Sequence, residues 1–66
     1  MRIRLNGLYK ELPDGVTIDA LLTLCNIERA GIAVEVNREI CPKRLHAVTA
    51  LADGDNVEIV RMMGGG

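Results

Sequence analysis

The sequence predicts an α+β fold: a mixed sheet of four to five strands with one main helix lying across one face. Two observations lead to this prediction. Several short segments alternate polar and apolar residues, as half-buried strands do, while a single segment repeats apolar residues at helical spacing. The 66 residues can form only one domain, and a domain this small must be compact and regular to bury a core.

The first predicted element is a hairpin. Residues 1–6 alternate polar and apolar side chains, so Ile3 and Leu5 share one face of a strand. The pair Asn6-Gly7 follows, and it suits a type I′ turn because both central residues of that turn have positive φ. A second strand over residues 8–12 then runs antiparallel to the first, and a Pro-Asp-Gly turn ends it.

One helix is predicted over residues 18–26. Thr17 can cap its N-terminus, and Asp19 lies in the first turn, where the positive end of the helix dipole favours an acid. The apolar residues of this segment recur at i, i+3, i+4 and i+7 and form one stripe: Ile18, Leu21, Leu22 and Cys25. We therefore interpret Cys25 as a small core residue rather than a reactive thiol.

A second pair of strands is predicted after the helix. The third strand covers residues 32–37, with Ile32, Val34 and Val36 on one face. Asn37-Arg38 is expected to form a tight turn, because Asn tolerates positive φ. A short fourth strand follows, formed by Glu39, Ile40 and Cys41 and ended by Pro42.

The segment over residues 43–51 has a mixed pattern. We expect a helical turn here that covers the sheet edge with Leu45 and Leu51. His46 has basic neighbours in sequence and no nearby acid or nucleophile, so we interpret it as a solvated surface histidine.

The final strand is predicted over residues 56–62, with Val57 and Ile59 inward. If it pairs parallel to the first strand, the crossover through the helix keeps the usual right hand. This is the β-grasp arrangement, and on the pattern alone a split βαβ variant stays open. We assign residues 1–63 to the β-grasp domain and residues 64–66 to a flexible glycine tail.

Composition excludes several classes of function. The formal net charge is −1 and Tyr9 is the single aromatic residue, which argues against nucleic-acid and membrane partners. There is no long apolar run and no export signal, so we expect a cytoplasmic protein with Cys25 and Cys41 reduced. A single histidine and the lack of a Cys-x-x-Cys motif argue against a metal site.

The chain ends on Gly64, Gly65 and Gly66. Without a Cβ, the main chain can enter a slot too narrow for any other residue. One interpretation is a tail that is threaded into an enzyme's channel, where its terminal carboxylate is modified. The other interpretation is an ordinary frayed end.

Several short motifs occur in a recognisable order: Leu5-Asn6-Gly7, the run Leu-Pro-Asp-Gly-Val-Thr-Ile at residues 12–18, Leu21-Leu22, the run Val-Glu-Val-Asn-Arg-Glu-Ile at residues 34–40, Pro42, Asp53-Gly54-Asp55 and the terminal glycines. Their order and spacing resemble the ThiS family, the small ubiquitin-like sulfur carriers of thiazole synthesis. The similarity spans essentially the whole chain. Arg38 departs from the Gly that often follows this Asn, which affects the turn and not the chemistry.

The resemblance implies a carrier and not an enzyme. The carboxylate of Gly66 would be adenylated by an E1-like adenylyltransferase of the ThiF type, which uses ATP and magnesium. It would then become a thiocarboxylate with sulfur from a cysteine desulfurase or a related donor. Thiazole synthase would take that sulfur in thiamine biosynthesis. The carrier would bind no cofactor of its own and would be a monomer when alone.

The body of such a carrier has to supply recognition. Strand alternation puts Ala33, Val60 and Met62 on the face away from the helix, near the exit of the tail. We expect them to form a small apolar patch that docks the partner together with Gly64 and Gly65. The alternative is that one or more of the three packs internally.

Three other functions share this pattern. A MoaD-like small subunit of molybdopterin synthase would use the same chemistry with another acceptor. A ubiquitin-like modifier would form an amide with lysines through the same acyl adenylate. A non-covalent β-grasp adaptor would not use the glycine end at all.

Overall fold

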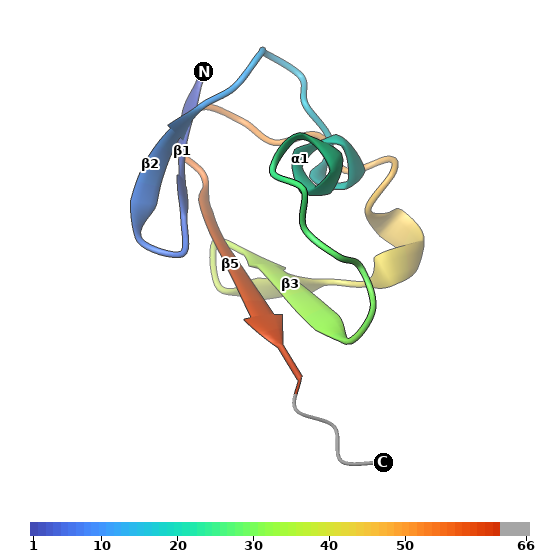
Figure 1. The fold of residues 1–66 in the computed structure, drawn as a ribbon. Helices are drawn as coiled ribbons and strands as arrows, with labels where there is room; N and C mark the ends of the chain where they lie inside the picture. The colour runs from blue at the N-terminus through green and yellow to red at the C-terminus, as the bar shows by residue number, and fades with distance from the viewer. Residues whose placement is uncertain (63–66) are drawn as a thin grey trace.

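Five strands form one mixed sheet in the order β2-β1-β5-β3-β4 in the computed structural model, which describes residues 1–62 (Figure 1). The strands are β1 (Arg2–Leu5), β2 (Leu8–Glu11), β3 (Ile32–Val36), β4 (Glu39–Cys41) and β5 (Asn56–Arg61). The last strand is central: β5 pairs parallel with β1 and antiparallel with β3. This order confirms the β-grasp prediction, and the chain does not adopt the split βαβ alternative.

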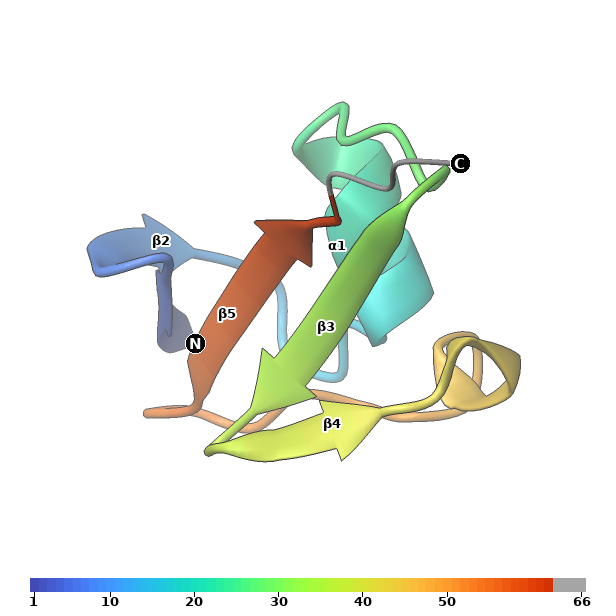
Figure 2. The ribbon, with the colours of Figure 1, turned by 90° about the horizontal axis from the view of Figure 1, so that it is seen from below.

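The single α-helix, α1 (Ile18–Leu24), lies across one face of the sheet (Figure 1, Figure 2). The predicted cap is confirmed, because Thr17 Oγ1 accepts a hydrogen bond from the Ala20 N–H at 3.1 Å. No helix within residues 1–62 is long and apolar enough to cross a membrane.

The core lies between α1 and the sheet. Its buried residues come from β1, β3, β5, α1 and the connections: Ile3, Leu5, Val34, Val57, Ile18, Leu21, Leu22, Leu12, Val16 and Leu51. The predicted inward faces of the first, third and last strands are therefore confirmed, although Ile32, Val36 and Ile59 are only half-buried.

Both predicted hairpin turns have positive φ at their two central residues. Asn6 and Gly7 have φ of 49° and 85°, and Asn37 and Arg38 have φ of 52° and 71°. These values agree with the mirror-image turns that match the twist of two-residue hairpins.

The helix ends two residues earlier than predicted. Cys25 is its C-cap, with its backbone N–H bonded to the carbonyl of Leu21, and Asn26 has a φ of 55°. A left-handed residue directly after the cap stops the helix. Cys25 is half-buried against the core, and both it and Cys41 are free thiols.

The prediction that His46 is a solvated surface residue is wrong. A short 3₁₀ turn at Lys43–Leu45 (η1) brings the chain back to the first turn of α1. His46 is therefore only 8% exposed. Its Nε2 lies 3.0 Å from the carbonyl oxygen of Cys41, and its own carbonyl accepts the Asp19 N–H at 3.0 Å. Leu51 is buried as predicted, whereas Leu45 is half-buried.

Candidate functional site

The predicted modification site, Gly66, follows β5 in the sequence. Gly66, with Gly64 and Gly65, falls outside the described residues 1–62. What the structure shows is how the body holds the chain up to Met62, which directly follows β5.

The end of β5 is fixed to the loop before β3. The Met62 N–H donates to the carbonyl of Gly31 at 2.7 Å, and Arg61 Nη1 donates to the carbonyl of Ala30 at 3.0 Å. Gly31 has a φ of 70°, and a Cβ on it would lie 3.8 Å from the carbonyl oxygen of Met62. The chain is therefore held as far as Met62 by one backbone and one side-chain hydrogen bond, neither of which was predicted from the sequence.

Two of the three predicted docking residues lie side by side. Ala33 on β3 is the register partner of Val60 on β5. Both strands lie next to each other with α1 behind them (Figure 2). Val60 is 51% exposed and Met62 is 57% exposed, while Ala33 is half-buried. An apolar surface is thus present at the C-terminal end of β5.

The rest of this outer face carries charges of both signs. Glu35 on β3 lies directly opposite Glu58 on β5, and no salt bridge engages either side chain within residues 1–62. Arg2 and Arg4 extend over the ring of Tyr9, with guanidinium carbons 4.6 Å and 5.7 Å from its centroid. The outer face is therefore basic toward the β2 edge and acidic between β3 and β5. At the C-terminal end of β5 it is apolar.

The described residues show an exposed apolar surface and no catalytic constellation. Among residues 1–62 no group of three or more His, Cys, Asp or Glu side chains gathers as metal ligands would. The His46 ring is bonded to a backbone carbonyl and not to a nucleophile or an acid. This arrangement can bind a partner and present a chain end to it.

These features define a ubiquitin-like β-grasp domain. Its five-stranded sheet has the last strand, β5, in the centre, one helix lies across the sheet, and an apolar surface lies at the end of β5. Comparison with known proteins gives the family. The model of the ThiS family matches residues 3–66, and the chain belongs to that family.

Individual relatives differ in length. The sulfur carrier protein ThiS of Bacillus subtilis is 38% identical over 65 residues, covering 97% of this chain and 98% of that protein. A thiazole synthase of Paramagnetospirillum magneticum is 39% identical over 66 residues, but the chain spans only 20% of its length. The crystal structure of the thiamine biosynthesis protein ThiS from Geobacter metallireducens superimposes with a TM-score of 0.89 at 29% identity, covering both chains completely.

Proposed function

We propose that this chain is a sulfur carrier whose Gly66 carboxylate is adenylated, converted to a thiocarboxylate and used to deliver sulfur to thiazole formation in thiamine biosynthesis. The observation that carries the proposal is that the family match runs through the glycines to Gly66. The β-grasp body supports it, because the central strand β5 leads the chain directly to that end.

The chemistry explains why the carrier needs a partner enzyme. A terminal carboxylate, with a reference pKa of about 3.5, is ionised at neutral pH and resists attack by a sulfur nucleophile. When its oxygen attacks the α-phosphorus of ATP, pyrophosphate leaves and an acyl adenylate forms. A sulfur nucleophile can then displace AMP from the acyl carbon. Magnesium held by the partner would neutralise charge on the phosphates.

The partner for the first step would be a ThiF-type adenylyltransferase. We propose that it docks on Ala33, Val60 and Met62, because this exposed apolar surface adjoins the point where the described chain ends. Met62 has a flexible thioether side chain that adapts to different surfaces, which suits a carrier that meets several enzymes in turn. Gly64 and Gly65 would then enter the active-site channel, since they have no side chains to obstruct it.

The sulfur acceptor would be thiazole synthase. Two proteins named thiazole synthase, from Paramagnetospirillum magneticum and Magnetococcus marinus, each align with the whole chain over 20% of their own length. A ThiS-like segment within such proteins supports a working partnership between the two components. The sulfur donor would be a cysteine desulfurase or a related enzyme. Two free thiols suit the reducing cytoplasm, where we place the carrier.

Intact mass spectrometry tests the proposal. The chain is incubated with ATP, magnesium, a ThiF-type adenylyltransferase and a sulfur source. Replacement of oxygen by sulfur should raise its mass by about 16 Da. A variant that lacks Gly65 and Gly66 should show no increase. An unchanged mass with an active partner would contradict the carrier function, and a mass increase equal to a whole protein would indicate a modifier instead.

A further inference from the structure

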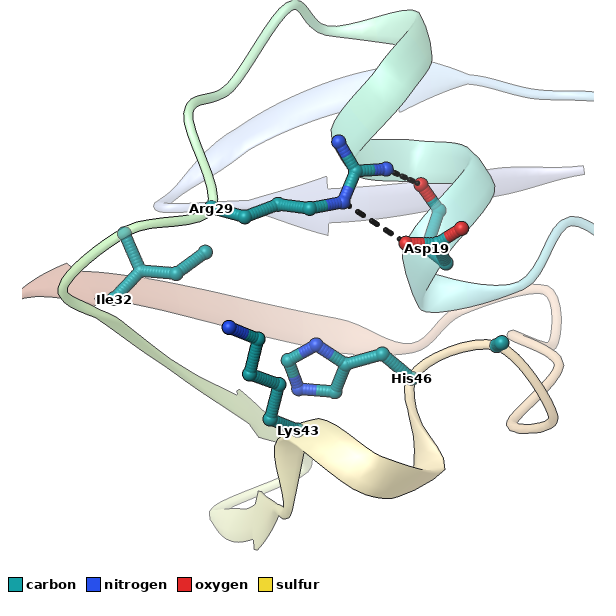
Figure 3. A pocket seen from close by; sticks show the side chains of 6 residues that line it. Asp19, Arg29, Ile32, Lys43 and His46 are labelled. Atoms are coloured by element: carbon teal, nitrogen blue, oxygen red, sulfur yellow. Dashed lines mark hydrogen bonds and ion pairs between the residues drawn. The ribbon is translucent and has the colours of Figure 1, made fainter.

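The outer face of the sheet, away from α1, carries charged side chains without salt-bridge partners among residues 1–62. On the helix side the chain pairs its own charges. Arg29 Nε donates to Asp19 Oδ1 at 2.9 Å, and Figure 3 shows this pair beside a pocket under α1. On the outer face, no salt bridge in this part of the chain engages Arg2 or Arg4. These arginines are therefore available to the carboxylates of a partner.

One aromatic ring orders the basic end of this face, which we define as Arg2, Arg4 and Tyr9. Arg4 and Tyr9 are register partners on β1 and β2, and Tyr9 is 66% exposed. Arg2 also extends over the ring, although Glu11 lies directly opposite Arg2 in the register. A guanidinium held over a ring can still donate to a carboxylate through its N–H groups. Because the two side chains are ordered before a partner arrives, binding costs less conformational entropy.

The middle of the same face is acidic. Glu35 on β3 and Glu58 on β5 are register partners, and we call them the acidic pair. They share a face with the basic end, because Arg4 pairs with Asn56, two residues before Glu58 on β5. Like charges directly opposite each other destabilise a sheet. A basic side chain of a partner that contacts both carboxylates would remove this repulsion.

The charge pattern favours a protein surface as the occupant of this face. A nucleic acid or an anionic membrane would be attracted by the arginines but repelled by the acidic pair. The apolar register partners Ala33 and Val60 follow two residues away from the acidic pair on the same two strands. An apolar centre with polar and charged groups around it is the usual composition of a protein interface.

We infer that this face docks the adenylyltransferase of the proposed function in one orientation. Carboxylates of the enzyme would contact the basic end, and a basic side chain of the enzyme would contact the acidic pair. The inference rests on the proposed function and extends its apolar docking surface toward β1 and β2. Apolar contacts are not directional, whereas charges at two different places on the face fix the orientation of the complex.

The first test is a pair of charge reversals on the two sides of the sheet. Arg4→Glu and Lys10→Glu make the same change in net charge. Lys10 is the register partner of the buried Ile3, so its position belongs to the side of the sheet opposite to Arg4. Both residues are exposed, and circular dichroism checks that each variant melts as the unmodified chain does.

The acidic pair has its own matched variants. Glu58→Lys and Glu39→Lys make the same charge change at exposed positions. Glu39 is the register partner of Val36, which alternates with Glu35 on β3 and so lies on the other side of the sheet.

Pyrophosphate release at several carrier concentrations gives KM and kcat for adenylation. Arg4→Glu and Glu58→Lys should each raise KM about tenfold at low salt and leave kcat within about twofold. The two controls should change KM by less than about twofold. At about 0.5 M salt the increases should shrink, because ions screen charges across an interface.

The inference is overturned if either outer-face variant has the KM of its control, or if high salt leaves the increases unchanged. It is also overturned if sedimentation equilibrium finds a dimer of the chain that Arg4→Glu dissociates, because a second copy would then occupy the face. Normal adenylation with equal KM values overturns this inference alone. A lack of adenylation of the unmodified chain overturns the proposed function, and this inference with it.

Discussion

Asn6 and Asn37 hold the central strand from its two sides. Asn6 Oδ1 accepts the Ile59 N–H at 2.7 Å, and Asn6 Nδ2 donates to the Ile59 carbonyl at 3.3 Å. Asn37 Oδ1 accepts the Asn56 N–H at 2.9 Å. Each asparagine thus forms a positive-φ turn and also bonds to β5. These bonds matter because β1 itself pairs with β5 at only two positions, Arg4–Asn56 and Leu5–Val57.

Replacing Asn6 by glycine isolates this second role. Asn6→Gly keeps the positive φ but removes both bonds to Ile59, so it should lower the free energy of unfolding by about 1–2 kcal/mol. Asn26→Gly is the matched control, because Asn26 also has a positive φ, of 55°, but no side-chain hydrogen bond within residues 1–62. Urea unfolding measures both. Equal midpoints for the two variants would show that Asn6 contributes only its backbone conformation.

Local turns were predictable from the sequence, whereas side-chain contacts between distant residues were not. The Asn6-Gly7 pair predicts its turn because the constraint on φ is local. The bonds from Asn6 to Ile59 join residues 53 apart and depend on strand register, which no local pattern contains. His46 was misjudged for the same reason: its basic sequence neighbours suggest solvent, but its contacts are to Asp19 and Cys41 on other elements.

At the scale of elements, β3 and β5 form the surface that we propose for partner docking. Alternation along these strands predicts that Ala33, Val60 and Met62 share the outer face, because the side of a sheet residue is fixed by parity. In the structure Ala33 pairs with Val60, and Val60 and Met62 are more than half exposed. The contacts from Met62 to Gly31 and from Arg61 to Ala30 were not predictable, since they depend on how an irregular loop returns to the sheet. The early helix end likewise required the left-handed φ of Asn26.

A charged residue introduced on this surface should weaken partner binding without unfolding the domain. Val60→Asp should lower the rate of adenylation by the partner at least tenfold, because an unpaired carboxylate would be buried in the interface. It should leave the domain folded, since Val60 is 51% exposed. Val48→Asp is the control, because Val48 is 73% exposed and lies after η1, away from β5. Pyrophosphate release measures adenylation. Full adenylation activity of Val60→Asp would contradict docking of the partner on this surface.

At the scale of the whole molecule, 66 residues leave a small margin of stability. A domain of this length is expected to have about 3–10 kcal/mol of unfolding free energy. The fold class was nevertheless predictable, because the hairpin turns, the helix cap and the apolar stripes all agree with one topology. The folded domain holds β5 between β1 and β3.

Two leucines of α1 test how much the packing of the helix against the sheet contributes to the stability of the domain. Leu22 is fully buried and Leu24 is 60% exposed. Leu22→Ala should lower the free energy of unfolding by about 2–5 kcal/mol and leave much of the chain unfolded. Leu24→Ala should change it by less than about 1 kcal/mol. Thermal unfolding followed by circular dichroism distinguishes them, and similar melting temperatures would mean that the helix does not pack as described.

A labelled sulfur atom shows whether this chain delivers sulfur to thiazole. The thiocarboxylate is prepared on Gly66 with a heavy sulfur isotope, isolated, and given to thiazole synthase with its other substrates, and to molybdopterin synthase in parallel. We predict that the isotope appears in the thiazole product and that the carrier returns to its original mass. Unlabelled thiazole, or transfer only to molybdopterin, would contradict the account.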